Sequence, residues 1–112
     1  MTTPASEVGN IIAKHSDESE KERLAFQKFF DEGEQRELKE YLDKKNYVFV
    51  KSGFANGHIV EYMWMQAMYI DLNQKTITGR LTNTPVNITG IKLGDWTVVK
   101  FENILSLQKG QP

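Results

Sequence analysis

A chain of 112 residues with a formal net charge of −1 and no cysteine favours one domain and excludes disulfides, zinc–thiolate sites and cysteine nucleophiles. It has no apolar run near the roughly 20 residues of a membrane span and no secretory signal at its start, so we expect a soluble cytoplasmic protein with no membrane partner. Residues 1–46 hold eight basic and eleven acidic side chains, residues 47–112 hold six and four, and neither half is basic enough to predict a nucleic-acid partner.

Two amphipathic helices are expected in the first half of the chain. The first spans residues 16–31, and Ser16 or Ser19 is its expected N-cap because a serine hydroxyl accepts from the free N–H groups of the first turn. Gly33 is the expected break, and residues 34–45 should form a second helix or extend the first helix after a kink. Apolar residues at helical spacing form the expected stripes: Leu24, Ala25, Phe26, Phe29 and Phe30 in the first helix, and Leu38, Tyr41 and Leu42 in the second.

From Tyr47 onward the pattern changes to strands. The expected strands are residues 47–51, 59–70, 75–82 and 96–101, with a tight turn at Asn56-Gly57. The long strand is apolar on both faces, which is typical of a mid-sheet position. One face should carry Met63, Met65, Ala67 and Tyr69, and the other Val60, Tyr62, Trp64, Met68 and Ile70.

The remaining segments connect and close these elements. Proline cannot donate to a strand ladder, so Pro85 should end the third strand. The connector at residues 86–93 should be anchored by Val86, Ile88 and Ile91. The whole predicts an α+β fold in which N-terminal helices pack on a curved antiparallel sheet of about four strands. We expect an N-terminal arm at 1–15, a single domain at 16–108 and a frayed C-terminus at 109–112.

Several short motifs occur in a fixed order along this pattern: Glu61-x-Met63-Trp64, Gly79-x-Leu81-x-Asn83-x-Pro85 and Gly94-Asp95-x-x-Val98, preceded by Ala25 to Phe30 and Val50-Lys51. With these motifs, the chain from about Leu24 to Leu107 resembles the YegJ-like family of small uncharacterised bacterial domains. The resemblance implies a bacterial setting and this fold, but no reaction. Related small domains lie beside polymorphic toxins, so the resemblance also implies an immunity protein.

The candidate chemistry is sparse. The chain has no phosphate loop, nucleophile elbow or zinc signature, so we expect no catalytic residues, no cofactor and no metal. Glu61 lies beside an apolar strand, where a charge needs a partner. We expect an ion pair with Lys51 and favour this structural role over a functional one. An enzyme would need Glu61, His58 and Asp95 to converge in one pocket; otherwise His58 is an exposed loop residue and Asp95 a turn residue.

The methionines around Trp64 allow two interpretations. Met63, Met65 and Met68 either pack in the core or form an adaptable binding surface. Only one face of their strand can point at the helices. The other face must therefore meet loops, the N-terminal arm or another molecule.

These features predict a non-enzymatic bacterial immunity protein that binds and occludes a cognate protein toxin. The acidic half is either a solvated helix surface or the face that docks a basic partner. The alternative function is a small ligand-binding or regulatory module that uses the curved sheet, with Trp64, Tyr62 and Trp96 lining the site. The expected partner-binding residues, besides the arm around 5–15, are Asp31, Glu32, Glu34, Glu37, Glu61 and Trp64.

Overall fold

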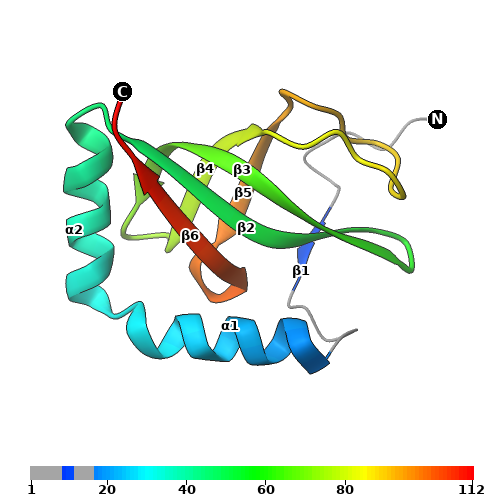
Figure 1. The fold of residues 1–112 in the computed structure, drawn as a ribbon, viewed down its shortest axis with the longest axis horizontal. Helices are drawn as coiled ribbons and strands as arrows, with labels where there is room; N and C mark the ends of the chain where they lie inside the picture. The colour runs from blue at the N-terminus through cyan, green and yellow to red at the C-terminus, as the bar shows by residue number, and fades with distance from the viewer. Residues whose placement is uncertain (1–8, 12–16) are drawn as a thin grey trace.

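The computed structural model describes residues 9–11 and 17–112. Figure 1 shows two helices set at a steep angle to each other along two sides of a strongly curved sheet. The elements in chain order are β1 (Gly9–Ile11), α1 (Asp17–Phe29), α2 (Glu32–Asp43), β2 (Tyr47–Asn56), β3 (Ile59–Asp71), β4 (Thr76–Leu81), β5 (Trp96–Lys100), the 3₁₀ turn η2 (Phe101–Asn103) and β6 (Ile104–Gly110). Neither described helix is long and apolar enough to cross a membrane.

The break between the helices lies at Asp31, two residues before the position predicted from Gly33. The Asp31 carboxylate caps α2 by accepting the N–H of Glu34 at 2.9 Å. Gly33 lies in the first turn of α2, where an added Cβ would come 3.3 Å from Asp31 Oδ1. Ser19 lies inside α1, so its predicted capping role is wrong, and Ser16 lies outside the described residues.

The described strands form one six-stranded antiparallel sheet, so the predicted α+β fold with helices on a curved sheet is confirmed. β3 lies between β2 and β4, the mid-sheet position that its composition predicted. On its other side β2 pairs with two strands, β6 along residues 47–52 and β1 along residues 53–55. These two strands were not among the four expected ones.

The C-terminal strand is longer than its sequence suggests. β6 runs to Gly110, with Lys109 opposite Val48 and Gly110 opposite Tyr47. The Tyr41 hydroxyl donates to the Gly110 carbonyl at 2.8 Å. The predicted frayed end at 109–112 is therefore wrong for its first two residues, because both pair with β2 through their backbone.

A β-bulge changes the alternation of β3. Met63, Met65 and Ala67 are buried as predicted, but the register shifts between Ala67 and Tyr69. One extra residue reverses the faces beyond it, so Tyr69 is 59% exposed and Ile70 is buried. The predicted faces of these last two residues are therefore wrong.

β4 and the connector after it complete the inner face of the sheet, which we define as the face that carries the core. Ile77, Gly79 and Leu81 are buried, which confirms the predicted alternation of β4. In the connector Ile88 and Ile91 are buried as expected, whereas Val86 is 84% exposed. Val86 holds the connector through its backbone instead, as described below. The core consists of Phe30, Leu38, Val48, Val50, Phe54, Met63, Met65, Ala67, Ile70, Ile77, Leu81, Ile88, Ile91, Val99, Phe101 and Ile104.

Candidate functional site

A hollow of about 400 Å³ opens where α1, α2 and β6 meet. We call it the corner hollow. Phe30 and Leu38 are almost fully buried, whereas Phe29 is 62% exposed. The hollow is thus a largely apolar depression with an accessible aromatic side chain. Its lining residues are Phe26, Phe29, Phe30, Glu34, Leu38, Ser106, Leu107 and Lys109.

Aromatic packing fixes one wall of this hollow. The rings of Phe26 and Phe30, one helical turn apart, have centroids 4.9 Å apart. Phe30 in turn meets Phe101 edge to face at 5.2 Å. The wall is therefore part of the core and does not depend on a ligand for its shape.

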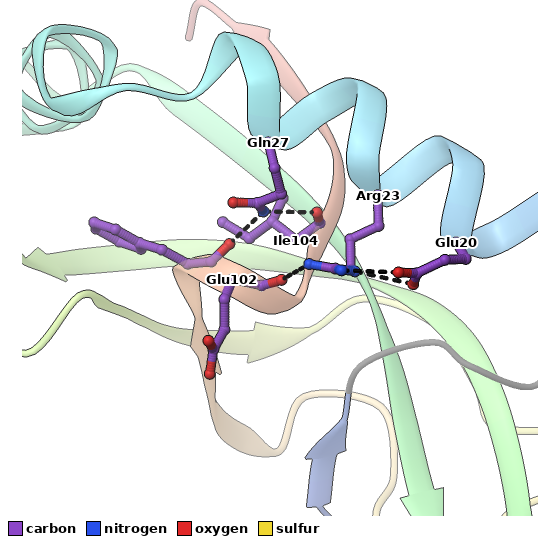
Figure 2. Close-up of polar contacts among 6 residues, drawn as sticks. Glu20, Arg23, Gln27, Glu102 and Ile104 are labelled. Atoms are coloured by element: carbon purple, nitrogen blue, oxygen red, sulfur yellow. Dashed lines mark hydrogen bonds and ion pairs between the residues drawn. The ribbon is translucent and has the colours of Figure 1, made fainter.

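The side of α1 that faces the turn into β6, which we call its underside, is polar. The sequence pattern did not predict this. Figure 2 shows Arg23 and Gln27 reaching from α1 to the turn that leads into β6. Arg23 donates to the Glu102 carbonyl at 2.8 Å, and Gln27 donates to the carbonyls of Phe101 at 2.7 Å and Ile104 at 3.2 Å. These bonds satisfy carbonyl groups at a turn where the regular ladder is interrupted.

Glu20 holds the Arg23 guanidinium in place. Its carboxylate accepts from Arg23 Nη2 at 2.9 Å and from Nε at 3.1 Å, a two-point contact. The hydrogen bond from Arg23 to Glu20 raises the pKa of Arg23, against an opposing effect of desolvation. Arg23 and Gln27 together fix the rotation of α1 about its axis.

That rotation leaves apolar side chains on the outside of α1. Leu24 is 48% exposed, Phe29 is 62% exposed and Ala25 is exposed. The predicted stripe of five residues is therefore not one buried face. Phe26 and Phe30 pack inward, while the other three lie on the side that Arg23 and Gln27 turn away from the sheet.

The acidic residues predicted to bind a partner gather beside the corner hollow, at the start of α2. Asp31 is committed to the cap, and Glu34 lines the hollow. Glu32 and Glu37 are exposed, and neither makes an ion pair with another residue in the described part of the chain. Residues 31–43 are acidic overall, because they hold six acids, Asp31, Glu32, Glu34, Glu37, Glu40 and Asp43, and two bases, Arg36 and Lys39. The lining of the hollow itself carries one acid, Glu34, and one base, Lys109.

Glu61 has a different environment. Its carboxylate accepts the backbone N–H groups of Val86 at 2.9 Å, Asn87 at 2.7 Å and Ile88 at 3.2 Å. Burial of this carboxyl raises its pKa, but the three N–H groups together outweigh that effect and hold the pKa below its ordinary value. Glu61 therefore fixes the connector between β4 and β5 and has little capacity left for a partner.

The predicted ion pair between Glu61 and Lys51 is wrong. The β2–β3 register places Trp64 opposite Lys51 and Phe54 opposite Glu61. Lys51 Nζ instead lies 3.1 Å from the carboxylate of Glu22 on α1. The sequence could place both residues on neighbouring strands, but the register that decides their contact depends on turn geometry.

Trp64 lies away from the corner hollow, on the sheet face opposite the core. It lines a second, shallower hollow of about 330 Å³ with Phe49, Thr82, Asn83 and Gln108, which we call the Trp64 hollow. The Asn83 side chain accepts the Trp64 N–H at 2.5 Å, and the Thr82 hydroxyl donates to the Trp64 carbonyl at 3.0 Å. Tyr62 and Trp96, which were expected to share a site with Trp64, do not line this hollow.

The other two candidate residues, His58 and Asp95, lie at turns. His58 is exposed next to the β2–β3 turn, where Gly57 has a φ of 67°. Asp95 accepts the N–H of Lys92 at 3.0 Å, the turn role expected for it. Within residues 9–11 and 17–112, no group of three histidine or acidic side chains is placed to hold a metal ion.

The exposed Phe29 and the inward Arg23 and Gln27 were missed by the sequence analysis. A signal for them does exist, because Arg23 and Gln27 are four residues apart and flank the inward position of Phe26. Two polar residues at this spacing beside an inward, partly buried aromatic are consistent with a helix face that contacts backbone. Their partners, however, lie more than 70 residues away in the chain.

One family model matches the chain, and it carries the description "Uncharacterized protein conserved in bacteria (DUF2314)". The match spans residues 13–107, which include both helices and nearly all residues of the two hollows. No curated protein and no solved structure matches.

Proposed function

The chain belongs to this bacterial family, and we propose that it is a non-enzymatic binding protein that occludes a basic protein partner through the corner hollow. The observation that carries the proposal is the pairing of exposed apolar residues on α1, Leu24 and Phe29, with the unpaired acids of α2. Phe29 and Glu34 both line the depression, and the exposed acids Glu32 and Glu37 lie on the same helix as Glu34.

The apolar part of this surface supports a protein partner. Stable interfaces have an apolar centre with a few aromatic anchors and a polar rim. Phe29 has the exposure and the position of such an anchor, since it borders a hollow whose wall is already packed. Covering one such side chain contributes about 1.5–3 kcal/mol.

The charged part indicates the chemistry of the partner. Glu32 and Glu37 are exposed and lack a described counter-charge, so a basic surface would gain favourable contacts without first breaking existing ion pairs. Complementary charge of this kind mainly accelerates association and selects the partner. We therefore place Lys- or Arg-rich segments of the partner against α2.

We further propose that the partner is a bacterial toxin and that this protein confers immunity to it. The proposal is supported by the resemblance to YegJ-like domains, some relatives of which lie beside toxins, and by a sequence without catalytic motifs. Of the residues expected to bind the toxin, Glu32, Glu34 and Glu37 remain in the proposal, whereas the Asp31 carboxylate caps α2. Glu61 and Trp64 lie outside this surface.

The test is binding to, and protection from, the product of the neighbouring gene. Purified protein should bind it in a calorimetric titration, and co-expression should rescue growth of cells that produce it. Phe29→Ala should weaken binding at least tenfold, whereas the matched control Val86→Ala, also at an exposed apolar residue, should not. Glu37→Lys should weaken binding more than Glu18→Lys. Glu18 is an exposed acid in the first turn of α1, at the end of that helix away from α2.

No complex at micromolar concentrations and no growth rescue would contradict the proposal. Equal losses in Phe29→Ala and Val86→Ala would keep a binding function but move it away from the corner hollow. The alternative function, a small ligand-binding module on the sheet, rests on the shallower Trp64 hollow. A quench of tryptophan fluorescence by a metabolite, in the absence of a protein partner, would favour it.

A further inference from the structure

We propose that the sheet face opposite the core is a second binding surface, which takes an extended acidic peptide. The peptide would place an apolar side chain in the Trp64 hollow and an acidic side chain, two residues away, on Arg80. We call this face the outer face and define it by Phe49, Trp64, Gln66, Tyr69, Thr78, Arg80, Trp96 and Val98. The inference does not depend on the function proposed above, because it uses different residues.

The strand register brings these residues into continuous rows. Phe49 lies opposite Gln66, Gln66 opposite Arg80, and Arg80 opposite Trp96, so one row crosses β2 to β5. A second row joins Tyr69, Thr78 and Val98.

The outer face exposes several large apolar side chains. Tyr69 is 59% exposed, Val98 is 50% exposed and Trp96 is 46% exposed. The helical residues Phe30 and Leu38 pack in the core on the inner face and do not cover the outer face. Contiguous exposed apolar groups of this kind mark binding surfaces.

Arg80 supplies the charge that selects an acidic ligand. Its guanidinium carbon lies 4.6 Å from the centroid of the Trp96 ring, a cation–π contact. No ion pair to Arg80 occurs within the described residues. A guanidinium can donate two parallel N–H bonds to the two oxygens of a carboxylate.

The spacing between Arg80 and the Trp64 hollow defines the ligand. Thr82 lines that hollow and lies two residues beyond Arg80 in the chain. Extended backbone rises about 3.4 Å per residue, so the edge of the hollow formed by Thr82 lies about 7 Å from Arg80. An extended peptide repeats its side chains on one face at the same interval. The surface therefore fits an apolar residue and an acidic residue separated by one position.

Single-stranded RNA is the other ligand class that uses aromatic side chains and arginine on a sheet. Such ligands need several cations along the phosphate backbone. The row from Phe49 to Trp96 contains Arg80, whereas Lys51, opposite Trp64, is paired with Glu22, and Lys100 lies opposite Thr76 at the end of β5. The whole chain has a net charge of −1. A carboxylate peptide therefore fits better than a polyphosphate chain.

The test uses the intrinsic fluorescence of the full chain, whose two tryptophans, Trp64 and Trp96, both lie on the outer face. The probe is a blocked Ser-Gly-Leu-Ser-Glu-Gly-Ser peptide, and the control peptide has lysine in place of glutamate. The first peptide should shift the emission and bind at least tenfold more tightly than the second. A uridine oligonucleotide is titrated in parallel.

Two variants locate the binding. Arg80→Gln should lower the affinity for the glutamate peptide about tenfold and bring it to that of the lysine peptide. Lys92→Gln, which removes an exposed cation in the connector, should leave the affinity unchanged. Thermal midpoints within a few degrees of the parent protein verify that both variants are folded. If Arg80→Gln does not fold, Trp96→Phe replaces it in the test, because this variant changes the ring that Arg80 contacts.

Three results would overturn the inference: no emission change with the glutamate peptide up to millimolar concentration, equal affinity for both peptides, or tighter binding of the oligonucleotide than of the peptide. None of these results depends on the corner hollow. The Phe29→Ala protein should bind the glutamate peptide as the parent does, so failure of this inference and failure of the proposed function are separable.

Discussion

Two sets of acidic residues in this protein, Glu61 and the rim acids Glu32 and Glu37, show how the same functional group serves different ends. The Glu61 carboxylate accepts three backbone N–H groups and holds the connector between β4 and β5. The carboxylates of Glu32 and Glu37 are exposed and have no ion-pair partner in the described part of the chain. The comparison teaches that the bonds already made by an acid, rather than its presence in the sequence, separate a structural role from a binding role.

The largest expected effect comes from removing the Glu61 carboxylate. Glu61→Ala should lower the free energy of unfolding by about 2–3 kcal/mol, because the N–H groups of Val86, Asn87 and Ile88 lose a charged acceptor together. Urea denaturation measures this loss. The matched control is Glu37→Ala, which should change stability by less than about 0.5 kcal/mol. Equal effects of the two variants would remove the distinction between the two sets of acids.

A second large effect is expected at the underside of α1. Gln27→Leu should cost about 1–3 kcal/mol, since the carbonyls of Phe101 and Ile104 lose their side-chain donor and an apolar group cannot replace it. Gln35→Leu is the control on α2, where one bond to a backbone carbonyl, that of Phe30, is lost together with an exposed bond from Lys75 Nζ. A smaller loss for Gln27→Leu than for Gln35→Leu would contradict the role given to the underside of α1.

Acid should weaken the Glu61 anchor specifically. The pKa of Glu61 is lower in the folded protein than in the unfolded chain, so the ionised carboxylate favours the folded state. This contribution is fully present above the unfolded pKa of about 4.3 and is lost as the pH falls through the lower folded pKa. The difference in unfolding free energy between the parent and Glu61→Gln should therefore be constant from pH 7 to about pH 5 and shrink toward pH 2.5.

Other carboxyl groups titrate over the same range, so the parent protein alone cannot isolate Glu61. Subtracting the curve of Glu61→Gln from that of the parent removes their contribution. A difference that grows as the pH falls would show that the sign assigned to the Glu61 pKa is wrong.

The smallest expected effect on stability belongs to the rim of the corner hollow. Glu32→Lys together with Glu37→Lys should move the thermal midpoint by no more than about 2–4 °C, because neither side chain makes a described ion pair. The same double variant should lose most of its affinity for the proposed basic partner. Scanning calorimetry and the binding titration together sharpen the comparison, since Glu61→Gln should show the opposite pattern.

Much of the fold was predictable because local patterns and turn chemistry agree with the final structure. The periodicity change at Tyr47, the Asn56-Gly57 turn and the alternation of β4 locate the expected strands, although β2 runs to Asn56, five residues beyond its predicted end. The stripe of Leu38, Tyr41 and Leu42 likewise gives the correct inner face of α2. In each case the residues that decide the structure are neighbours in the chain.

Predictions failed where contacts between distant residues or single inserted residues decide the structure. The bulge after Ala67 reverses the two faces of β3 with no glycine or proline to mark it. The β2–β3 register gives Lys51 a partner on α1 instead of Glu61. The candidate site was predictable only in its acidic rim, because the aromatic hollow beside it is assembled from both helices and β6.

The sequence by itself determined two amphipathic helices, a sheet-rich second half and an acidic surface on the second helix. Composition, periodicity and turn residues suffice for these features, since each depends on interactions over a few residues. Only the tertiary structure decided that Glu61 holds the connector and that Arg23 and Gln27 turn Phe29 outward beside the acids of α2. These outcomes follow from strand register and helix rotation, which are set by contacts between segments more than 20 residues apart.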